Sequence, residues 1–216
     1  MIADNQAGKI QYDKDKAYLF GAYLGDGCCS KYSGYCFRIV SGDKDIIERT
    51  SLIVEQLIRK KSKIREIKPN NTLLFDFQAF NKDLFMTLTS LTDKKSKIPE
   101  FILGSDKEIV LEFVAALMDT DGYISAGINK FGQQRFSLGF VNSAEWMDQF
   151  ISLLRNFGVK VGKKTLKGKF RSVNEKDCYQ ININLRSFVE HGFYFYCQRK
   201  QSLLERYKTN VKYQSY

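Results

Sequence analysis

Two aspartates, each followed by a glycine, stand at the same place in two similar apolar segments. The segments are residues 15–27, which contain Asp26, and residues 108–122, which contain Asp121. Both predict a helix that is apolar on nearly every side and ends at a glycine, so both helices are expected to be buried. A carboxylate in the last turn opposes the helix dipole and favours a compensating cation there. Asp26 and Asp121 are therefore candidate Mg²⁺ ligands, because paired carboxylates can hold a metal that activates water against a phosphodiester.

The sequence has few residues that could support another catalytic chemistry. The chain has one histidine, His191, beside Gly192, and it has neither a G-x-S-x-G sequence nor a P-loop. These absences disfavour a histidine-dependent nuclease and a zinc hydrolase, and they leave carboxylate plus metal. The five cysteines form no C-x-x-C pair and are odd in number, so neither a zinc ribbon nor a disulfide framework is expected. They indicate a reducing, intracellular compartment.

The elements that must position the two aspartates also repeat. Each apolar helix is followed by two predicted strands, an amphipathic helix, two more strands and a closing helix. In the first copy the better-defined elements are residues 35–41, 45–60, 63–68, 72–78 and 82–91. In the second copy they are residues 135–141, 144–157, 159–167, 177–184 and 186–196, with an extra helix at residues 198–207. The sequence therefore predicts an α+β fold of two pseudo-symmetric αββαββα units, residues 1–92 and 106–216, joined by a linker at residues 93–105.

Small residues line both apolar helices, namely Gly21, Gly25, Ala115 and Ala116. They leave room for two helix backbones to approach closely. The sequence thus predicts that the two aspartate-bearing helices pack against each other.

The charge balance favours a polyanionic partner. Lys and Arg total 34 against 24 Asp and Glu, a net charge of +10, and neutralising phosphates releases their condensed counterions. Charge alone fits a merely basic soluble protein equally well. No apolar run is long enough to span a membrane, and the N-terminus is polar and unlike a signal peptide, so no membrane partner is expected.

Basic and amide side chains occupy comparable places in the two copies, where a polar sheet face could meet base edges in a DNA groove. Lys61, Lys63 and Arg65 follow the period of two of a strand. The candidate DNA-binding residues are Arg38, Lys61, Lys63, Arg65 and Lys68 in the first copy, and Asn129, Gln133, Gln134, Arg135, Lys163, Lys164, Lys167, Asn182 and Asn184 in the second. For any one of them, the alternative is an ordinary solvated surface residue.

Residues 19–27 (LFGAYLGDG) and 114–122 (VAALMDTDG) resemble the two signature helices of a single-chain LAGLIDADG homing endonuclease. The resemblance covers almost the whole chain. It implies a saddle of two antiparallel sheets on double-stranded DNA, with the motif helices packed at the central interface of a monomer. It implies that Asp26 and Asp121, with the residues before them, Gly25 and Thr120, bind a divalent metal. This metal would be Mg²⁺, for which Mn²⁺ could substitute. Both DNA strands would be cut, leaving short 3′ overhangs.

The same resemblance implies a basic residue after the third helix of each unit, where it polarises the attacking water. The candidates are Lys94, Lys95 and Lys97 in the first copy and Arg199 and Lys200 in the second; we favour Lys97 and Lys200. The resemblance also implies a polar residue at the end of the second strand. Asn142 fits this position in the second copy, whereas the first copy offers only Ser41 or Gly42. We therefore expect the two DNA strands to be cut at unequal rates.

Two other functions fit the same scaffold. An intron maturase would bind group I intron RNA as a splicing cofactor, but a pure binder loses affinity when carboxylates face phosphates. A transcription regulator would need a helix-turn-helix domain, for which the stretch after Tyr196 is too short. The Lys-, Asn- and Ile-rich composition suggests an AT-rich genome, and so an organelle or a bacterial or phage-infected cytoplasm.

Overall fold

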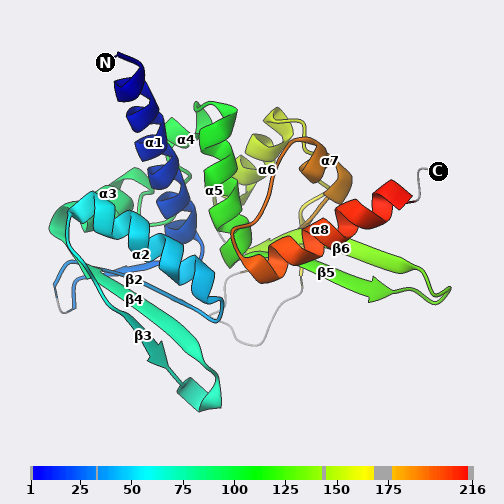
Figure 1. Ribbon diagram of the computed structural model, residues 1–216, viewed down its shortest axis with the longest axis horizontal. Helices are drawn as coiled ribbons and strands as arrows, with labels where there is room; N and C mark the ends of the chain where they lie inside the picture. The colour runs from blue at the N-terminus through cyan, green and yellow to red at the C-terminus, as the bar shows by residue number, and fades with distance from the viewer. Residues whose placement is uncertain (1, 33, 143–144, 168–176, 214–216) are drawn as a thin grey trace. The chain divides into compact units, whose positions relative to one another are not determined.

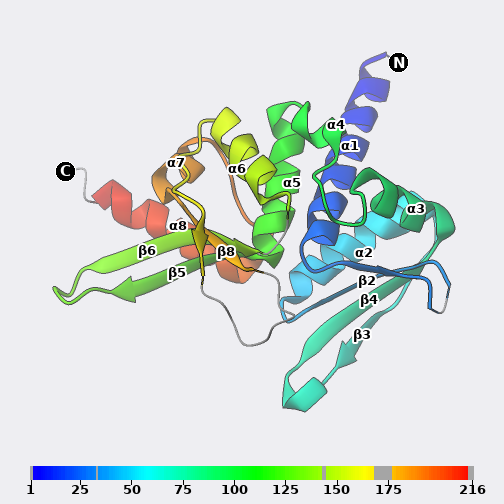
Figure 2. The same cartoon turned by 180° about the vertical axis from the view of Figure 1, so that it is seen from behind.

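The computed structural model describes residues 2–32, 34–142, 145–167 and 177–213 (Figure 1 and, from behind, Figure 2). Its fold is α+β, as predicted, and the chain divides into two compact units, Met1–Thr120 and Asp121–Tyr216. Each unit holds an antiparallel sheet that, within the described residues, has four strands. The predicted linker at residues 93–105 lies inside the first compact unit, because the second motif helix packs with the first.

The first unit follows the predicted order of elements. Its elements are α1 (Ile2–Leu24), β1 (Cys28–Ser30), β2 (Cys36–Ser41), α2 (Lys44–Ile58), β3 (Ile64–Ile67), a 3₁₀ turn (Pro69–Asn71), β4 (Leu74–Phe80), α3 (Lys82–Leu91), α4 (Glu100–Leu103) and α5 (Lys107–Thr120). The strands lie in the order β1-β2-β4-β3. Helix α1 begins well before the predicted start near residue 15.

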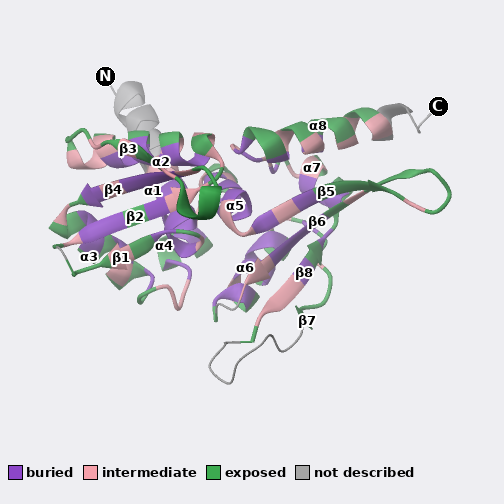
Figure 3. Cartoon of the chain, turned by 90° about the horizontal axis from the view of Figure 1, so that it is seen from below, coloured by how far each residue is buried: buried purple, intermediate pink, exposed green. Residues whose placement is uncertain are grey.

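One face of the first sheet is covered by helix α2. Alternate residues Phe37 and Ile39 of β2 and Phe77 of β4 are buried, and so are Ile47 and Val54 on the apolar stripe of α2 (Figure 3). The apolar residues that recur every second position on the strands therefore pack in one core with those that recur about every 3.6 positions on the helix. The residues between these apolar positions lie on the open face of the sheet.

Helices α1 and α5 pack closely because α1 carries glycine at the contacts. A Cβ atom at Gly21 would lie 2.5 Å from the carbonyl oxygen of Phe113 and 2.7 Å from the Cβ of Ala116. A Cβ atom at Gly25 would overlap the Thr120 hydroxyl and lie 2.6 Å from its Cβ. The expectation that small residues allow the motif helices to pack together is confirmed.

The second unit repeats the sheet topology of the first. Its elements are β5 (Gly122–Ile128), β6 (Gln134–Asn142), α6 (Met147–Asn156), β7 (Thr165–Leu166), β8 (Tyr179–Ile183), α7 (Leu185–Glu190) and α8 (Gln198–Tyr213). The strands lie in the order β5-β6-β8-β7, which is the first order carried over element by element. Phe140, Trp146 and Phe150 form its aromatic core, with ring centroids 4.9–6.3 Å apart.

Two predicted elements of the second unit are wrong in length. The strand expected at residues 159–167 is reduced to the short β7, preceded by an isolated bridge from Val161 to Ile183. The helix expected at residues 186–196 ends at Glu190, because Gly192 takes a left-handed φ of 77°. Phe193 then stacks on Phe188 with a centroid distance of 5.2 Å. Sequence periodicity cannot show such a return of the chain.

Within the described residues, no helix is both long enough and apolar enough to cross a lipid bilayer.

Candidate functional site

In the first unit, Asp26 lies directly after α1, in a turn closed by backbone hydrogen bonds. The amide of Gly25 donates to the carbonyl of Gly21 at 3.0 Å, and the amide of Gly27 donates to the carbonyl of Ala22 at 2.9 Å. This is the glycine-terminated helix end that the sequence predicts. It leaves Asp26 exposed.

Lys95 reaches this turn from a segment distant in sequence. Its Nζ donates to the carbonyl oxygens of Gly25 at 2.7 Å and Gly27 at 3.1 Å, on either side of Asp26. The same ammonium lies 5.6 Å from the ring centroid of Tyr23. The Lys95 ammonium is therefore held at the end of α1 by the backbone on both sides of Asp26.

The backbone that carries Lys95 is strained. Asp93, Lys94 and Lys95 have φ values of 44°, 53° and 75°, the left-handed region, which costs a non-glycine residue about 1–3 kcal/mol. Thr92 holds this turn in place: its hydroxyl accepts from the amide of Lys95 at 3.1 Å, and its carbonyl accepts from the amide of Ser96 at 2.9 Å. Strain of this kind persists where the surrounding structure requires one particular placement, here that of Lys95.

The second unit places a lysine and an amide side chain around Asp121. Asn142, the last residue of β6, donates from Nδ2 to the Oδ2 of Asp121 at 2.7 Å. Lys200 is 5% exposed, and its Nζ donates to the carbonyl of Gly122 at 2.7 Å. A lysine thus lies against the glycine carbonyl next to the aspartate in both units.

The structure distinguishes among the other predicted catalytic residues. Lys97 forms an ion pair with Glu100 at 3.8 Å, and it is Lys95 that reaches the Asp26 turn. In the first unit Ser41 holds the place of Asn142 at the end of the strand, but its hydroxyl accepts from the amide of Asp43 at 3.1 Å. The amide support that Asn142 gives to Asp121 has no counterpart in the side chain of Ser41.

The groups at both aspartates fit a hard divalent cation. Asp26 and Asp121 offer carboxylate oxygens, and the neighbouring Gly25 and Thr120 have backbone carbonyls, which are the ligand types of Mg²⁺ and Ca²⁺. The Gly25 carbonyl already accepts from Lys95, so only its second lone pair is left for a cation. Among the described residues, no three histidine, cysteine or carboxylate side chains gather into a metal-binding cluster. One carboxylate per unit suits Mg²⁺, which commonly binds one or two carboxylates and takes its remaining ligands from water and phosphate.

The thiol of Cys29, shortly after the Asp26 turn, is protonated at neutral pH. Burial raises the pKa of Cys29 to about 12, partly offset by a hydrogen bond with Tyr23. Burial likewise raises the pKa of the Tyr23 hydroxyl. Neither group supplies a base at neutral pH.

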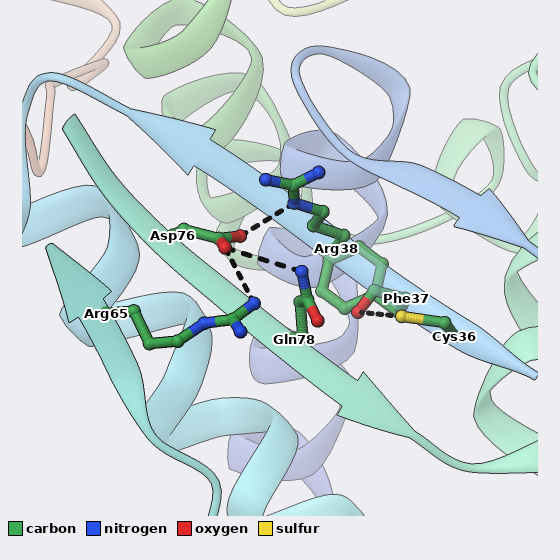
Figure 4. Close-up of polar contacts among 6 residues, drawn as sticks. All are labelled: Cys36, Phe37, Arg38, Arg65, Asp76 and Gln78. Carbon is green, nitrogen blue, oxygen red and sulfur yellow. Dashed lines mark hydrogen bonds and ion pairs between the residues drawn. The ribbon is translucent and has the colours of Figure 1, made fainter. Parts of the chain in front are cut away.

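The open face of the first sheet carries a charged cluster centred on Asp76 (Figure 4). Arg38 Nε donates to Asp76 Oδ1 at 2.8 Å, and Arg65 Nη2 donates to Asp76 Oδ2 at 2.9 Å. Gln78 Nε2 adds a longer contact to Oδ2 at 3.4 Å. Strand register explains the grouping, since Arg65 pairs with Asp76 and Arg38 pairs with Gln78 across the ladder.

The open face of the second sheet is neutral where the first is charged. Tyr123, Gly139 and Asn182 are in register on three neighbouring strands. The Tyr123 hydroxyl accepts from Gln180 Nε2 at 2.7 Å and donates to Asn182 Oδ1 at 3.2 Å. Gly139 makes room for the tyrosine, because a Cβ there would lie 2.6 Å from Tyr123 Cζ.

Several predicted DNA-binding residues are engaged in local structure. Asn129 accepts from the amides of Phe131 at 3.0 Å and Gln133 at 2.9 Å, and it also bonds the Gln133 side chain, so both polar residues build the β5–β6 turn. Asn184 caps α7 by accepting from the amide of Ser187 at 2.8 Å. Gln134 bonds Asn210 of α8 at 2.7 Å.

The remaining predicted residues stay at the surface. Arg135 is exposed on the open-face register of β6. Lys164 pairs with Asp148 and lies 5.0 Å from the ring centroid of Tyr179. The others are the exposed lysines Lys61, Lys63, Lys68, Lys163 and Lys167, all outside the strands.

Sequence reasoning did not identify Asp76, Gln78, Gln180 or Tyr123 as part of these polar faces. Asp76 and Gln78 alternate with the buried Phe75 and Phe77, which is a detectable open-face signal. A carboxylate there gave no reason to expect a DNA-facing role until its two arginine partners were known.

The chain matches parts of several curated proteins in sequence. No family model matches the chain. It is 28% identical to the ribonucleoside-diphosphate reductase NrdEB subunit alpha of Bacillus subtilis (strain 168), over 87% of this chain and 19% of that protein. It is 25% identical to the probable translation initiation factor IF-2 of Methanocaldococcus jannaschii, over 91% of this chain and 16% of that protein. It is 26% identical to the RNA polymerase subunit Rpo1C of the same organism, over 74% of this chain and 18% of that protein. The chain thus spans less than a fifth of the length of these curated relatives.

The structural neighbours are homing endonucleases. I-DmoI in complex with DNA and Ca matches with a TM-score of 0.56 at 19% identity, covering 83% of this chain and 87% of that one. I-WcaI bound to its DNA recognition sequence gives a TM-score of 0.51 at 14% identity, covering 79% and 76% of the two chains. The K262A mutant of I-SmaMI gives 0.56 at 12% identity, covering 92% of each chain. I-DmoI complexes with Mn and in the presence of Mg match as well. The fold of this chain is therefore that of the homing endonucleases.

Proposed function

We propose that the chain is a sequence-specific homing endonuclease that hydrolyses both strands of a double-stranded DNA site with a divalent metal. The observation that carries this proposal is the repeated pairing of aspartate and lysine. Lys95 binds the carbonyls beside Asp26, and Lys200 binds the carbonyl beside Asp121. An aspartate kept at this place in both sequence repeats is costly for a protein that only binds nucleic acid, because the two carboxylates repel phosphate.

Each group has a defined part in phosphodiester hydrolysis. Asp26 and Asp121, with the backbone oxygens of Gly25 and Thr120, would hold Mg²⁺ or Mn²⁺. Such a cation, when bound, stabilises charge on the phosphate and lowers the pKa of water. Lys95 and Lys200 place a positive charge where water is deprotonated. Asn142 orients Asp121 through its 2.7 Å hydrogen bond. We expect one strand to be cut by each unit, leaving short 3′ overhangs.

The relatives support a mobile element. A reductase subunit, a translation factor and a polymerase subunit share little in their names, yet each matches this chain over less than a fifth of its own length. A segment of about this size within such different proteins is best explained as a module that moves between genes. We propose that this chain acts on DNA for that purpose, as a monomer in an intracellular, reducing compartment.

The test uses a plasmid carrying the DNA sequence formed by joining the two flanks of the chain's coding segment. We expect Mg²⁺-dependent linearisation of this plasmid, and Asp121→Asn should abolish linearisation while binding to the same duplex persists. Glu108→Gln, which changes an exposed carboxylate at the opposite end of α5, is the matched control and should cut normally. Binding to intron RNA with no cutting in Mg²⁺ or Mn²⁺ would instead support a maturase.

A further inference from the structure

The cluster around Asp76 places a carboxylate where DNA binding would disfavour one. Asp76 lies on the open face of the first sheet, between positions occupied by Arg38 and Arg65. It is only 1% exposed, because the two guanidinium groups cover it, while the side chains of Arg38 and Arg65 are 45% and 55% exposed. The face therefore presents two cations to solvent and conceals the anion.

The hydrogen bonds leave the two arginines with different free donors. Arg38 uses Nε to bind Asp76, and among the described residues no hydrogen bond engages its Nη1 or Nη2. These two nitrogens form the terminal fork that matches the O6 and N7 acceptors of guanine. Arg65 has Nη2 engaged, so its terminal fork is already occupied and it retains only separate donors. Figure 4 shows both arginines on the same carboxylate, each through a different nitrogen.

We propose that Arg38, positioned by Asp76, reads a guanine in the major groove of the DNA target. This inference rests on the proposed function and adds a base and the residue that recognises it. Asp76 is a positioning residue: it touches no DNA, but it fixes Nε and so directs the free fork outward. Arg65 shares the carboxylate and contributes single contacts.

The expected loss of base preference can be given for each variant. A bidentate arginine–guanine contact discriminates against the wrong base by roughly 5- to 150-fold. Arg38→Lys keeps the charge but loses the fork, so it should remove this preference at one position of the target. Asp76→Asn keeps one acceptor oxygen but loses the charge and the second one, so Arg38 stays in place and is held less firmly. Because ordering a long side chain on binding weakens it by roughly 2- to 12-fold, the guanine preference should fall by that factor.

A merely structural role for Asp76 would give another result. Asp76→Asn also removes a negative charge from the DNA-facing side, so affinity for random duplex at low salt should stay equal or rise. Specificity and non-specific affinity are then expected to move in opposite directions. A variant that simply unfolds loses both. Arg38→Lys, which leaves a cation beside Asp76, keeps the inference testable in that case.

The experiment is a binding selection from a pool of random-sequence duplexes in EDTA, where no strand is cut. Wild-type protein should select a consensus containing at least one guanine that Arg38→Lys no longer selects. Arg186→Gln is the matched control, because Arg186 also engages a carboxylate through Nε at 2.7 Å, but on helix α7. That variant should select the wild-type consensus.

A chemical probe then identifies the contact. Replacing the selected guanine with 7-deazaguanine, which lacks N7, should weaken binding by wild-type protein and leave Arg38→Lys unaffected. A consensus with no guanine that depends on Arg38 overturns this inference alone, while cleavage of the selected duplex still supports the proposed function. Failure to select any consensus overturns both.

Discussion

The contact between Gly25 and Thr120 allows a sharp test of how α1 and α5 are held together. In Gly25→Ala, the new Cβ would overlap the Thr120 hydroxyl and lie 2.6 Å from its Cβ. The second atom is fixed to the helix backbone and cannot rotate away, so the two helices must separate. Overpacking of this kind costs about 1–3 kcal/mol, and we expect the upper part of that range.

A smaller effect opposes the clash. Gly25 has no left-handed φ, so alanine is allowed there, and it stabilises by about 0.4–1 kcal/mol through the unfolded chain. The net loss should be roughly 2 kcal/mol. For a chain of this size, that lowers Tm by roughly 4–8 °C.

The assay is a double-mutant cycle by thermal or urea unfolding. Thr120→Gly removes the three atoms nearest to the new methyl group, so the double variant should recover most of the loss from Gly25→Ala. Gly127→Ala is the control, since a Cβ there meets no described atom within 4 Å. A wild-type Tm for Gly25→Ala, or single effects that simply add in the double variant, would refute close glycine packing as the cause.

Three further predictions concern the two aspartate sites. In single-turnover nicking assays with each strand labelled, wild-type protein should cut its two strands at unequal rates. Asn142→Ala should slow the cutting of one strand by about 10- to 100-fold, as for other residues that orient a metal ligand. Equal rates in wild-type protein would contradict the asymmetry of Asn142 and Ser41. Lys95→Met should lower cleavage of one strand by about 100-fold or more, as expected for a group that assists proton transfer. Lys94→Gly should keep activity and stabilise the fold by up to about 1 kcal/mol, because glycine accepts the φ of 53° at this position. Similar cleavage rates for the two variants would show that Lys95 is not part of the site. Cys29 should resist alkylation at pH 8 and react increasingly as the pH rises toward its pKa of about 12. Because this pKa is raised in the folded state, the free energy of unfolding should fall above about pH 9. Mass spectrometry that shows Cys29 modified as fast as the exposed Cys28 would contradict the partial burial of the Cys29 thiol.

The sequence by itself determined the repeat and its two aspartates. Apolar periodicity, small residues and the Asp-Gly endings are local features, so residues 19–27 and 114–122 could be matched without a structure. The repeat also explains why the two sheets have the same strand order, which the sequence did not predict. Asn142 does end the second strand of its unit, as expected, and its contact with Asp121 is a finding of the structure.

Only the tertiary structure decided which side chains meet. Lys95 rather than Lys97 reaches the Asp26 turn because three left-handed residues direct it there, and no propensity favours that backbone. Asn184 looked like a DNA contact and is a helix cap. Asp76 was not singled out from the sequence, and in the structure it bonds Arg38 and Arg65, two predicted DNA-binding residues. Such pairings depend on strand register and on contacts between distant segments, which sequence spacing does not encode.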